Sequence, residues 1–326
     1  MNISEFAKEA GVSKAAVSRY FNNGYLSEEK RKMIEEAVDR TGYSPSRASH
    51  NADGRLTKLV GVIIPKLSSD SCARIVEGIS SVLQETGYEM LLVNTANDYK
   101  KEVEYLELFR KQRVDGVILL ASVFTPNHRT VLAKRGMPVV IAGQRYAGLS
   151  CVFHDDMGAA FTVTEHMIER GAKSFGYIGV MTEDEAVGTL RRKGFLKALE
   201  KHGIAHDRSN DAIAEFSMDS GYERMNALLR RRRRPDALFC VTDTIASGAV
   251  VRLREQGICV PEDVMIGSVG DSKLSRALSL TTAHMHYRTE GREAARLLMS
   301  SIYSDCIPRS LQIGFELVER HSTETL

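Results

Sequence analysis

A chain of 326 residues is long enough for two or three domains, and its 43% hydrophobic and 26% charged residues are typical of a globular protein. No apolar run approaches the roughly 20 residues of a membrane-spanning helix, and the first residues lack the basic start and apolar stretch of a signal peptide. We therefore expect a cytoplasmic protein. The net charge of +2 lies wholly in residues 1–58, which hold ten Lys/Arg and eight Asp/Glu, whereas the rest holds 34 of each. This excess marks the amino end as the place where a polyanion would bind.

The sequence indicates neither a metal site nor a catalytic site. The five cysteines are scattered singly and form no Cys-x-x-Cys, so we expect buried, reduced thiols (Cys72, Cys151, Cys240, Cys259 and Cys306). The run His154-Asp155-Asp156 lacks the further ligands that a metal needs. No strand is followed by a glycine-rich phosphate or dinucleotide loop, and no nucleophile elbow occurs. We predict no cofactor, no metal and no enzyme activity.

The first 21 residues predict two short helices joined by a tight turn. The first carries its apolar residues on one face and ends at Gly11, where a positive φ suits glycine. Ser13 is placed to cap the second helix. Two helices crossing through so short a turn form a helix-turn-helix. The predicted buried residues are Phe6, Ala7, Ala10, Ala16, Val17 and Tyr20.

A third helix is predicted from Glu28 to Arg40, after Ser27 as its cap. Its buried stripe is expected to hold Met33, Ile34, Ala37 and Val38. An ordinary helical hairpin is the alternative interpretation of this region. Against it, Lys14 and Arg19 project from the exposed start and middle of the second helix, and polar side chains able to reach phosphates surround them (Ser13, Ser18, Asn22 and Asn23).

The run AxxAGVSxxxVSRxxN, continued by LSEEKRKMIEEA and GYSPS, resembles the head of the lactose/galactose repressor family. The resemblance covers the whole chain and, within the family, looks closest to the sucrose and fructoside operon repressors. It implies that Lys14, Ala15 and Arg19 occupy the base-reading positions of the recognition helix. The planar fork of Arg19 could address O6 and N7 of a guanine together, whereas Ala15 offers only a methyl group.

In this family the segment after the head forms a hinge that contacts the minor groove, and a leucine there wedges between base pairs. The resemblance places Arg47, His50, Asn51 and Ala52 in this hinge, with Ala52 at the leucine position and Asp53 after it. A methyl group is a poor wedge and a carboxylate is repelled by phosphates. We therefore expect weak hinge intercalation, and expect A52L to tighten operator binding and increase DNA bending.

From Leu59 the pattern changes to short apolar runs that alternate with amphipathic segments, which predicts doubly wound parallel sheets with helices on both faces. The runs fall into two sets and so predict two similar lobes. The first set comprises strands at 59–65, 88–94, 115–121, 138–143 and 150–155, with helices near 72–86, 100–113 and 128–135. The second comprises strands at 174–180, 212–216, 236–242 and 264–270, with helices near 158–170, 189–202, 219–231 and 244–256.

The resemblance implies that the body is a periplasmic-binding-protein-like core joined by three crossovers. The whole fold is then α plus α/β: a three-helix head at 1–45, a hinge at 46–57 and the two lobes. The first lobe is predicted at 58–156 plus about 285–309, with helix 288–303. The second is predicted at 157–284 plus about 310–322, with a last strand at 311–319.

Ligands of such sheets bind beyond the carboxyl ends of the strands. This rule selects polar residues in the loops there: Ser69, Ser71, Gln144, Asp243 and Asp271. The resemblance adds Arg191, which this family points into its cleft, and Phe216 and Tyr287 as aromatic wall positions. Such side chains suit a neutral sugar, because its hydroxyls take bidentate hydrogen bonds while its apolar faces stack. Asp156 and Asp243 have an alternative interpretation as helix caps, which we favour for Asp156, and Phe216 could belong to the core.

The resemblance also implies a homodimer whose two heads bind adjacent half-sites of a palindromic operator. We expect the dimer to form through the helix bearing Ile75, Ile79, Val82 and Leu83 and through the segment 274–280. The run Arg230–Arg234 is interpreted as a solvated helix end rather than a second nucleic-acid site.

The function predicted from the sequence is therefore a DNA-binding transcriptional repressor whose operator affinity is controlled by a small sugar-type effector. Two alternatives stay open. One is a sugar-binding or sugar-processing α/β protein with a vestigial head. The other is a regulator controlled by a partner protein rather than by a sugar.

Overall fold

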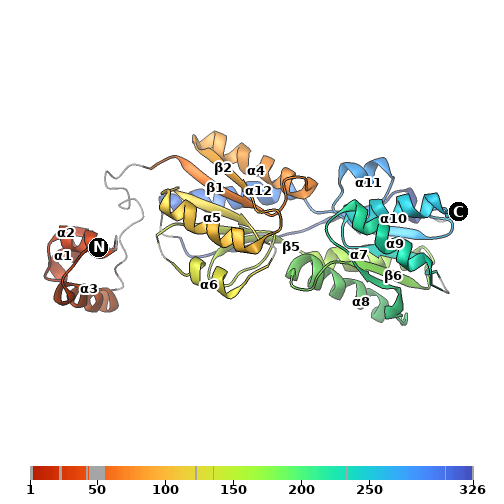
Figure 1. The fold of residues 1–326 in the computed structure, drawn as a ribbon, viewed down its shortest axis with the longest axis horizontal. Coiled ribbons are helices and arrows are strands. Elements are labelled where there is room, and N and C mark those ends of the chain that lie inside the picture. The colour runs from red at the N-terminus through yellow and green to blue at the C-terminus, as the bar shows by residue number, and fades with distance from the viewer. Residues whose placement is uncertain are drawn as a thin grey trace.

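The computed structural model describes residues 3–21, 24–41, 43, 56–121, 123–134, 136–231, 234–304 and 306–324. Figure 1 shows a small helical head followed by two α/β lobes. The head consists of α1 (Ile3–Glu9), α2 (Lys14–Phe21) and α3 (Glu28–Thr41). Gly11 has the expected positive φ of 66°, and the Ser13 hydroxyl accepts from the Ala16 amide at 3.2 Å. These features confirm the predicted turn and cap.

The head has its own apolar core around Phe6, Val17 and Ile34, all fully buried. The Phe6 ring stacks on Tyr43 at a centroid distance of 4.0 Å, which ties the end of the head back onto α1. One predicted core residue was wrong: Met33 is 38% exposed. Its side chain lies over the turn, so that a Cβ at Gly11 would come within 3.2 Å of the Met33 methyl carbon.

The first lobe is a six-stranded sheet in the order β11-β5-β4-β3-β1-β2, all parallel. Its central strands are wholly apolar and buried, because helices cover both faces. The elements are β1 (Leu59–Ile64), α4 (Asp70–Thr86), β2 (Glu89–Asn94), α5 (Tyr99–Lys111), β3 (Gly116–Leu120), α6 (Pro126–Leu132), β4 (Val139–Ala142), β5 (Ser150–His154), α12 (Tyr287–Tyr303) and β11 (Ser310–Ile313).

The second lobe repeats this plan with the sheet order β12-β10-β9-β8-β6-β7, in which only β12 is antiparallel. Its elements are α7 (Asp156–Glu169), β6 (Phe175–Gly179), a π-helical turn (Glu185–Leu190), α8 (Arg191–Lys201), β7 (Asp211–Ile213), α9 (Met218–Leu229), β8 (Ala237–Cys240), α10 (Asp243–Glu255), β9 (Met265–Val269), α11 (Lys273–Ala277), β10 (Thr281–His284) and β12 (Glu316–Val318). The sequence pattern missed α11 and β10.

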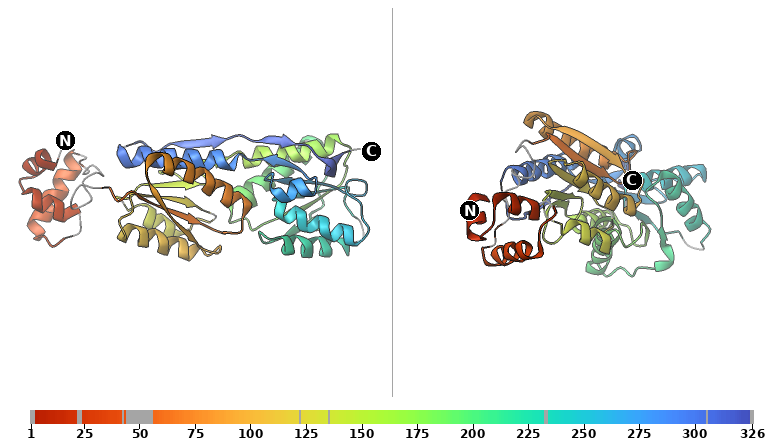
Figure 2. Two further views of the ribbon diagram at one scale, coloured as in Figure 1. Left: turned by 90° about the horizontal axis from the view of Figure 1, so that it is seen from above. Right: turned by 60° about the vertical axis from the view of Figure 1, so that its left-hand side comes forward.

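The chain passes between the lobes three times: after β5, after β10 and between β11 and β12. Figure 2 shows the resulting end-to-end arrangement of the lobes from above. The prediction of one strand over 311–319 in the second lobe was wrong. Residues Ser310–Ile313 pair with β5 of the first sheet, and the strand breaks at Gly314 before β12 pairs with β10. The last crossover therefore contributes one strand to each sheet.

Helices α4 and α12 pack at backbone contact distance along the first lobe. A Cβ at Gly78 would lie 2.2 Å from the Arg288 carbonyl oxygen, and one at Gly291 would lie 2.0 Å from that of Ile75. This packing buries the apolar face of α4. Ile75, Ile79, Val82 and Leu83 of this helix are 0–5% exposed in the core of the single chain. A dimer through α4 would therefore have to use the other face of the helix, and this part of the dimer prediction stays a prediction.

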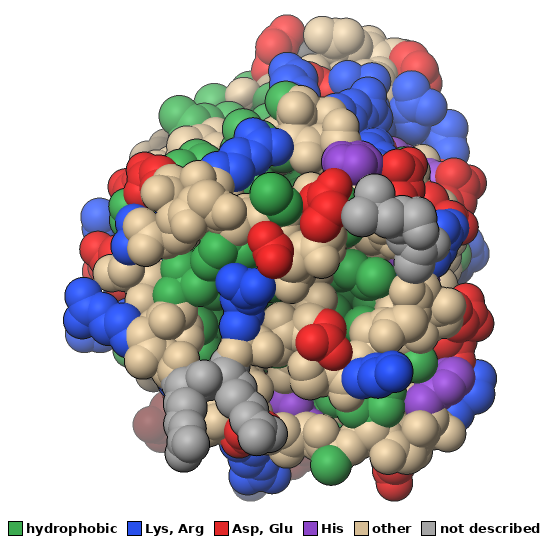
Figure 3. All heavy atoms as spheres, turned by 90° about the vertical axis from the view of Figure 1, so that its right-hand side faces the viewer, with side chains coloured by type: hydrophobic (Ala, Val, Ile, Leu, Met, Phe, Trp, Pro, Cys, Tyr) green, Lys and Arg blue, Asp and Glu red, His purple; other side chains and the backbone are tan. Residues whose placement is uncertain are grey.

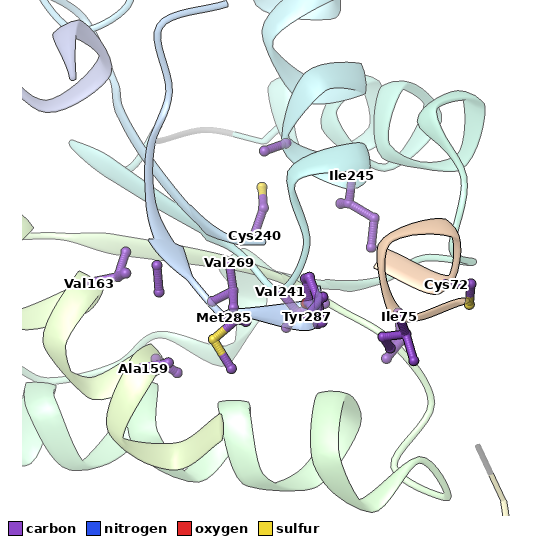
Figure 4. Packing of buried hydrophobic residues seen from close by; sticks show 14 of the residues in the cluster. Cys72, Ile75, Ala159, Val163, Cys240, Val241, Ile245, Val269, Met285 and Tyr287 are labelled. Atoms are coloured by element: carbon purple, nitrogen blue, oxygen red, sulfur yellow. The ribbon is translucent and has the colours of Figure 1, made fainter. Parts of the chain in front are cut away.

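The apolar cluster is continuous from the first lobe to the second. Figure 4 shows Cys72 and Ile75 of α4 and Tyr287 of α12 in the same cluster as Val241 and Val269 of the second lobe. Of the five free cysteines, three are buried as predicted, whereas Cys259 is exposed and Cys306 is half-buried.

The end of the second lobe carries a mixed surface. Figure 3 shows acidic and basic side chains interspersed on the face that it presents. Arg230 is the C-cap of α9, and Arg234 pairs with Asp263 at 3.2 Å, which agrees with a helix end rather than a continuous positive surface. In the described part of the chain, no helix has both the length and the apolar character needed to cross a membrane.

Candidate DNA-binding and effector sites

Helix α2 presents one polar and one apolar face. Ala16 and Val17 are buried against α1 and α3, whereas Ser13, Lys14, Ala15, Ser18 and Arg19 are exposed on the other side. The helix contains no acidic residue. A short helix that offers a lysine and an arginine on its free face has the size and charge to enter a major groove. The predicted contacts Asn22, Asn23, Arg47, His50, Asn51 and Ala52 lie outside the described residues.

A cavity of about 220 Å³ lies between the lobes, at the carboxyl ends of the strands of both sheets. Seven of the eight residues predicted to bind an effector line it: Ser69, Ser71, Gln144, Arg191, Phe216, Asp243 and Tyr287. Residues outside this predicted set also line it, including Lys66, Asp70, Arg74, His154, Asp156, Asp184 and Glu290. The cleft is therefore more acidic than the sequence suggested.

Arg191 is buried at the start of α8 and projects toward Asp156. Its Nε donates to Asp156 Oδ1 at 2.7 Å, and Nη1 donates to the Val241 carbonyl oxygen at 2.5 Å. Burial alone would lower the pKa of Arg191, but the carboxylate of Asp156 outweighs it and raises that pKa. The arginine follows a π-helical turn, an irregularity that is frequent at functional sites.

Asp156 was favoured as a helix cap, and that interpretation was wrong by one residue. The cap of α7 is Asp155, whose Oδ1 accepts from the Gly158 amide at 2.9 Å. Asp156 is thereby left to turn into the cleft and to pair with Arg191. The two consecutive aspartates therefore have different roles: Asp155 caps α7, and Asp156 pairs with Arg191. A capping rule cannot distinguish such adjacent positions.

Asp243 also lines the cavity, but its carboxylate already accepts three hydrogen bonds. Oδ1 accepts from the hydroxyls of Ser268 at 2.6 Å and Thr282 at 2.7 Å, and Oδ2 accepts from the Ser272 amide at 2.6 Å. The helix cap of α10 is Thr242, not Asp243. Asp243 thus ties the start of α10 to β9, β10 and α11 behind the cavity wall. It shapes the cleft more than it offers hydrogen bonds to it.

Asp271 is the predicted effector residue that the structure places elsewhere. It does not line the cavity, and its carboxylate accepts from Arg320 at 2.5 Å, His284 at 2.8 Å and Arg276 at 3.0 Å. Burial would raise the pKa of Asp271, yet these three donors hold it at about 2. The prediction was wrong because the partners Arg320 and His284 come from distant parts of the chain and turn the side chain away.

The remaining predicted residues come from both lobes. Ser69 caps α4 by accepting from the Cys72 amide at 3.4 Å, and its hydroxyl lies 2.9 Å from that of Ser71. Gln144 is buried and donates to the Ala121 carbonyl oxygen at 3.3 Å. Phe216 is half-buried against the core, and the Tyr287 ring packs edge-on to His154 at 5.3 Å.

Two basic side chains of the first lobe cross the cleft to backbone carbonyls of the second. Arg74 donates to Gly270 at 2.6 Å and to Asp271 at 3.3 Å, and Lys66 donates to Phe216 at 2.9 Å. The Arg74 guanidinium also lies 4.8 Å from the ring centre of Tyr287. Both bridges hold the lobes together at the mouth of the cavity.

Similarity to known protein families and to characterised repressors identifies the family of this chain. The lacI family model of bacterial regulatory proteins matches residues 2–46, and a periplasmic binding protein-like domain matches residues 164–323. The HTH-type transcriptional repressor PurR of Actinobacillus pleuropneumoniae serotype 3 is 31% identical over 332 residues, covering 99% of this chain and 98% of that protein. The chain belongs to the lacI family of bacterial regulatory proteins.

Further likenesses extend over the whole length. The sucrose operon repressor of Staphylococcus xylosus is 29% identical over 316 residues, covering 97% of this chain and 98% of the relative. Among solved structures, the transcriptional regulator CelR in complex with cellobiose superposes with a TM-score of 0.76 at 27% identity, covering 99% of both chains. This lacI-family chain is thus a transcriptional repressor with a helix-turn-helix head and a ligand-binding body, as its sequence predicted.

Proposed function

We propose that this lacI-family repressor binds a palindromic operator as a homodimer, and that a small sugar-type molecule in the cleft between its lobes controls that binding. The observation that carries the DNA-binding part is the exposed face of α2, where Lys14 and Arg19 stand clear of the head's core. Two-fold symmetry in the protein calls for two-fold symmetry in the DNA.

The effector part rests on the cavity between the lobes. Its walls combine the rings of Phe216 and Tyr287 with the polar groups of Gln144, Asp156 and Arg191. An apolar ring face and bidentate polar groups together are what a sugar requires. The relatives point the same way, since one is named a sucrose operon repressor and one solved neighbour holds cellobiose. An effector that binds the closed and open cleft unequally shifts the equilibrium between them and so alters the spacing of the heads.

The DNA-binding part is tested by gel shift against the promoter of the chain's own gene at fixed salt. R19A is expected to weaken binding and to lose discrimination at one base pair by about 1–3 kcal/mol, because its fork reads a base edge. K14A should also weaken binding. R254A is the matched control: it removes one positive charge from an exposed site on α10 in the body. If R19A and K14A bind as tightly as R254A, the recognition helix is wrongly assigned.

The effector part is tested by calorimetric titration with a panel of mono- and disaccharides, including sucrose, cellobiose, fructose and glucose. At least one sugar should release or absorb heat with the wild type and change its gel-shift affinity. A regulator controlled by a partner protein would give no heat with any of them.

A further inference from the structure

Glu290 lines the cavity, and among the residues that the structure describes neither a hydrogen-bond donor nor a lysine or arginine pairs with its carboxylate. It lies on α12 in the first lobe and is 0% exposed. Neither carboxylate oxygen has a hydrogen-bond partner. The amide of Gly143 beside it donates instead to the Val152 carbonyl oxygen at 3.0 Å. A buried acid without a donor is costly, so its retention on the wall of a cavity points to a ligand.

A second unpartnered group stands next to it. His154, at the end of β5, is 4% exposed, and its Nδ1 lies 3.5 Å from Glu290 Oε2. The His154 Nε2 atom has no partner. The Met285 backbone hydrogen-bonds to the same ring, which leaves Nε2 as the free nitrogen. Two different polar groups therefore reach the first-lobe wall of the cavity with unused hydrogen-bonding capacity.

Burial and the charged and titratable neighbours of Glu290 together determine its protonation state. Asp156 faces it from the start of α7, Cys72 from α4 and His154 from β5. Burial, and then the negative charge of Asp156, raise the pKa of Glu290 to about 8. Burial lowers the pKa of His154 to about 4, so the histidine is neutral. The cations of the cleft are engaged elsewhere: Arg191 pairs with Asp156, and Arg74 with Asp70.

We propose that Glu290 and His154 form a polar subsite for a neutral hydroxyl group of the effector, with Glu290 acting as an uncharged carboxylic acid. The Glu290 O–H donates to the ligand oxygen, and the ligand O–H donates to His154 Nε2, so that one hydroxyl satisfies both groups. The subsite rests on the proposed function only in taking the cleft as the effector site. An amino-bearing ligand would instead require an ionised Glu290.

The chain offers a matched control for this pair. Glu102 on α5 and His128 on α6 are also a fully buried Glu–His pair, with Nε2 and Oε2 3.1 Å apart, but neither lines the cavity. E102Q therefore makes the same chemical change in the same lobe without touching the cleft.

The first experiment measures the protein itself by infrared difference spectroscopy on the wild type, E290Q and E102Q. At pH 7 the wild type should show the carbonyl band of a buried carboxylic acid, and E290Q should lack it. The band should fade as the pH rises past about 8. If E290Q leaves the acid band at pH 7 unchanged, Glu290 is ionised and the proposal is overturned, whatever the ligand.

The second experiment measures binding of sucrose, cellobiose, fructose and glucose by calorimetry. For a sugar that binds the wild type, E290Q should bind within about threefold because the amide keeps a donor, whereas E290L should bind about tenfold more weakly. Between pH 7 and pH 9 the affinity of the wild type should fall while that of E290Q stays level. E102Q should match the wild type.

Equal losses in E290Q and E290L would overturn the proposal, because they would show that a negative charge is needed. If no sugar gives heat with the wild type, the proposal that a sugar is the effector is overturned. The proposal that a sugar hydroxyl occupies this subsite then fails as well. The infrared band reports on Glu290 separately, so the two failures remain distinguishable.

Discussion

Asp243 and Glu290 are two buried carboxylates that face the same cavity from opposite lobes, and they differ in what surrounds them. Asp243 accepts three hydrogen bonds from its own lobe, whereas Glu290 accepts none from the described residues. The carboxylate on the second-lobe wall thus has hydrogen-bond donors without any ligand, whereas the carboxylate on the first-lobe wall has none. Burial alone therefore does not mark a functional acid. What separates the two is whether the chain supplies the donors.

The largest effect is expected at the salt bridge of the second-lobe wall. Asp156 and Arg191 have side-chain exposures of only 4% and 5%. D156A would leave the Arg191 charge buried without its partner, which we expect to lower the free energy of unfolding by about 3–5 kcal/mol. Urea unfolding followed by circular dichroism measures the change.

The control for D156A is K193A. Lys193 forms an exposed pair with Glu185 at 4.0 Å, two residues beyond Arg191, and should contribute less than about 1 kcal/mol. If D156A shifts the urea midpoint no further than K193A does, the buried pair of Asp156 and Arg191 does not stabilise the second-lobe wall.

The next prediction concerns the sign of a change at each carboxylate. D243A removes the acceptor of Ser268, Thr282 and the Ser272 amide, and should lower the free energy of unfolding by about 2–4 kcal/mol because these buried donors lose their partner. E290L replaces an unpartnered acid with an apolar side chain and should raise it by about 1–3 kcal/mol. If D243A and E290L shift the urea midpoint of the wild type in the same direction, the distinction between these two carboxylates is wrong.

The pH dependence of stability should separate Glu290 from the rest of the molecule. Its pKa is about 8 in the folded protein and 4.5 ordinarily, so the folded state holds more protons than the unfolded state between these values. The stability of the wild type should therefore fall relative to E290Q as pH rises from about 5 to about 8, and stay level above. The slope should reach at most about 1.4 kcal/mol per pH unit.

The measurement is the difference in urea midpoint between wild type and E290Q at each pH from 5 to 9. Burial also raises the pKa of Asp184, to about 6, and lowers that of His154 to about 4. Both groups are present in the two proteins, and their contributions cancel in the difference to a first approximation. A difference that does not change between pH 5 and pH 8 would show that Glu290 is charged throughout.

The sequence could predict what local pattern determines. Ser13 and Gly11 signal the ends of two helices within a few residues, and the head followed from them. Alternating apolar runs predicted both sheets of the body. Seven of the eight predicted effector residues line the cavity, because the rule that ligands bind beyond strand carboxyl ends depends on topology and not on side-chain detail.

What could not be predicted depends on distant partners. Asp271 turns away from the cleft because Arg320, 49 residues later, reaches it. The partner of the apolar face of α4 could not be predicted, because α12, which covers it, lies more than 200 residues later. The sequence does carry a signal for Glu290, which lies four residues before Ala294 and eight before Leu298, on the buried stripe of its helix. A charged residue on such a stripe marks a candidate site.

The smallest expected effect tests whether the two walls are held together by the chain itself. Arg74 of the first lobe donates to the carbonyl oxygens of Gly270 and Asp271 in the second. R74A should weaken closure by about 1 kcal/mol, a roughly fivefold shift toward the open cleft, because two charge-assisted hydrogen bonds are lost while Lys66 still bridges to Phe216. Small-angle X-ray scattering without ligand should show a larger radius of gyration. R276A is the control, since Arg276 pairs with Asp271 within the second lobe. An equal radius for R74A and R276A would mean that the lobes stay closed without this bridge, and that apolar packing between them outweighs it.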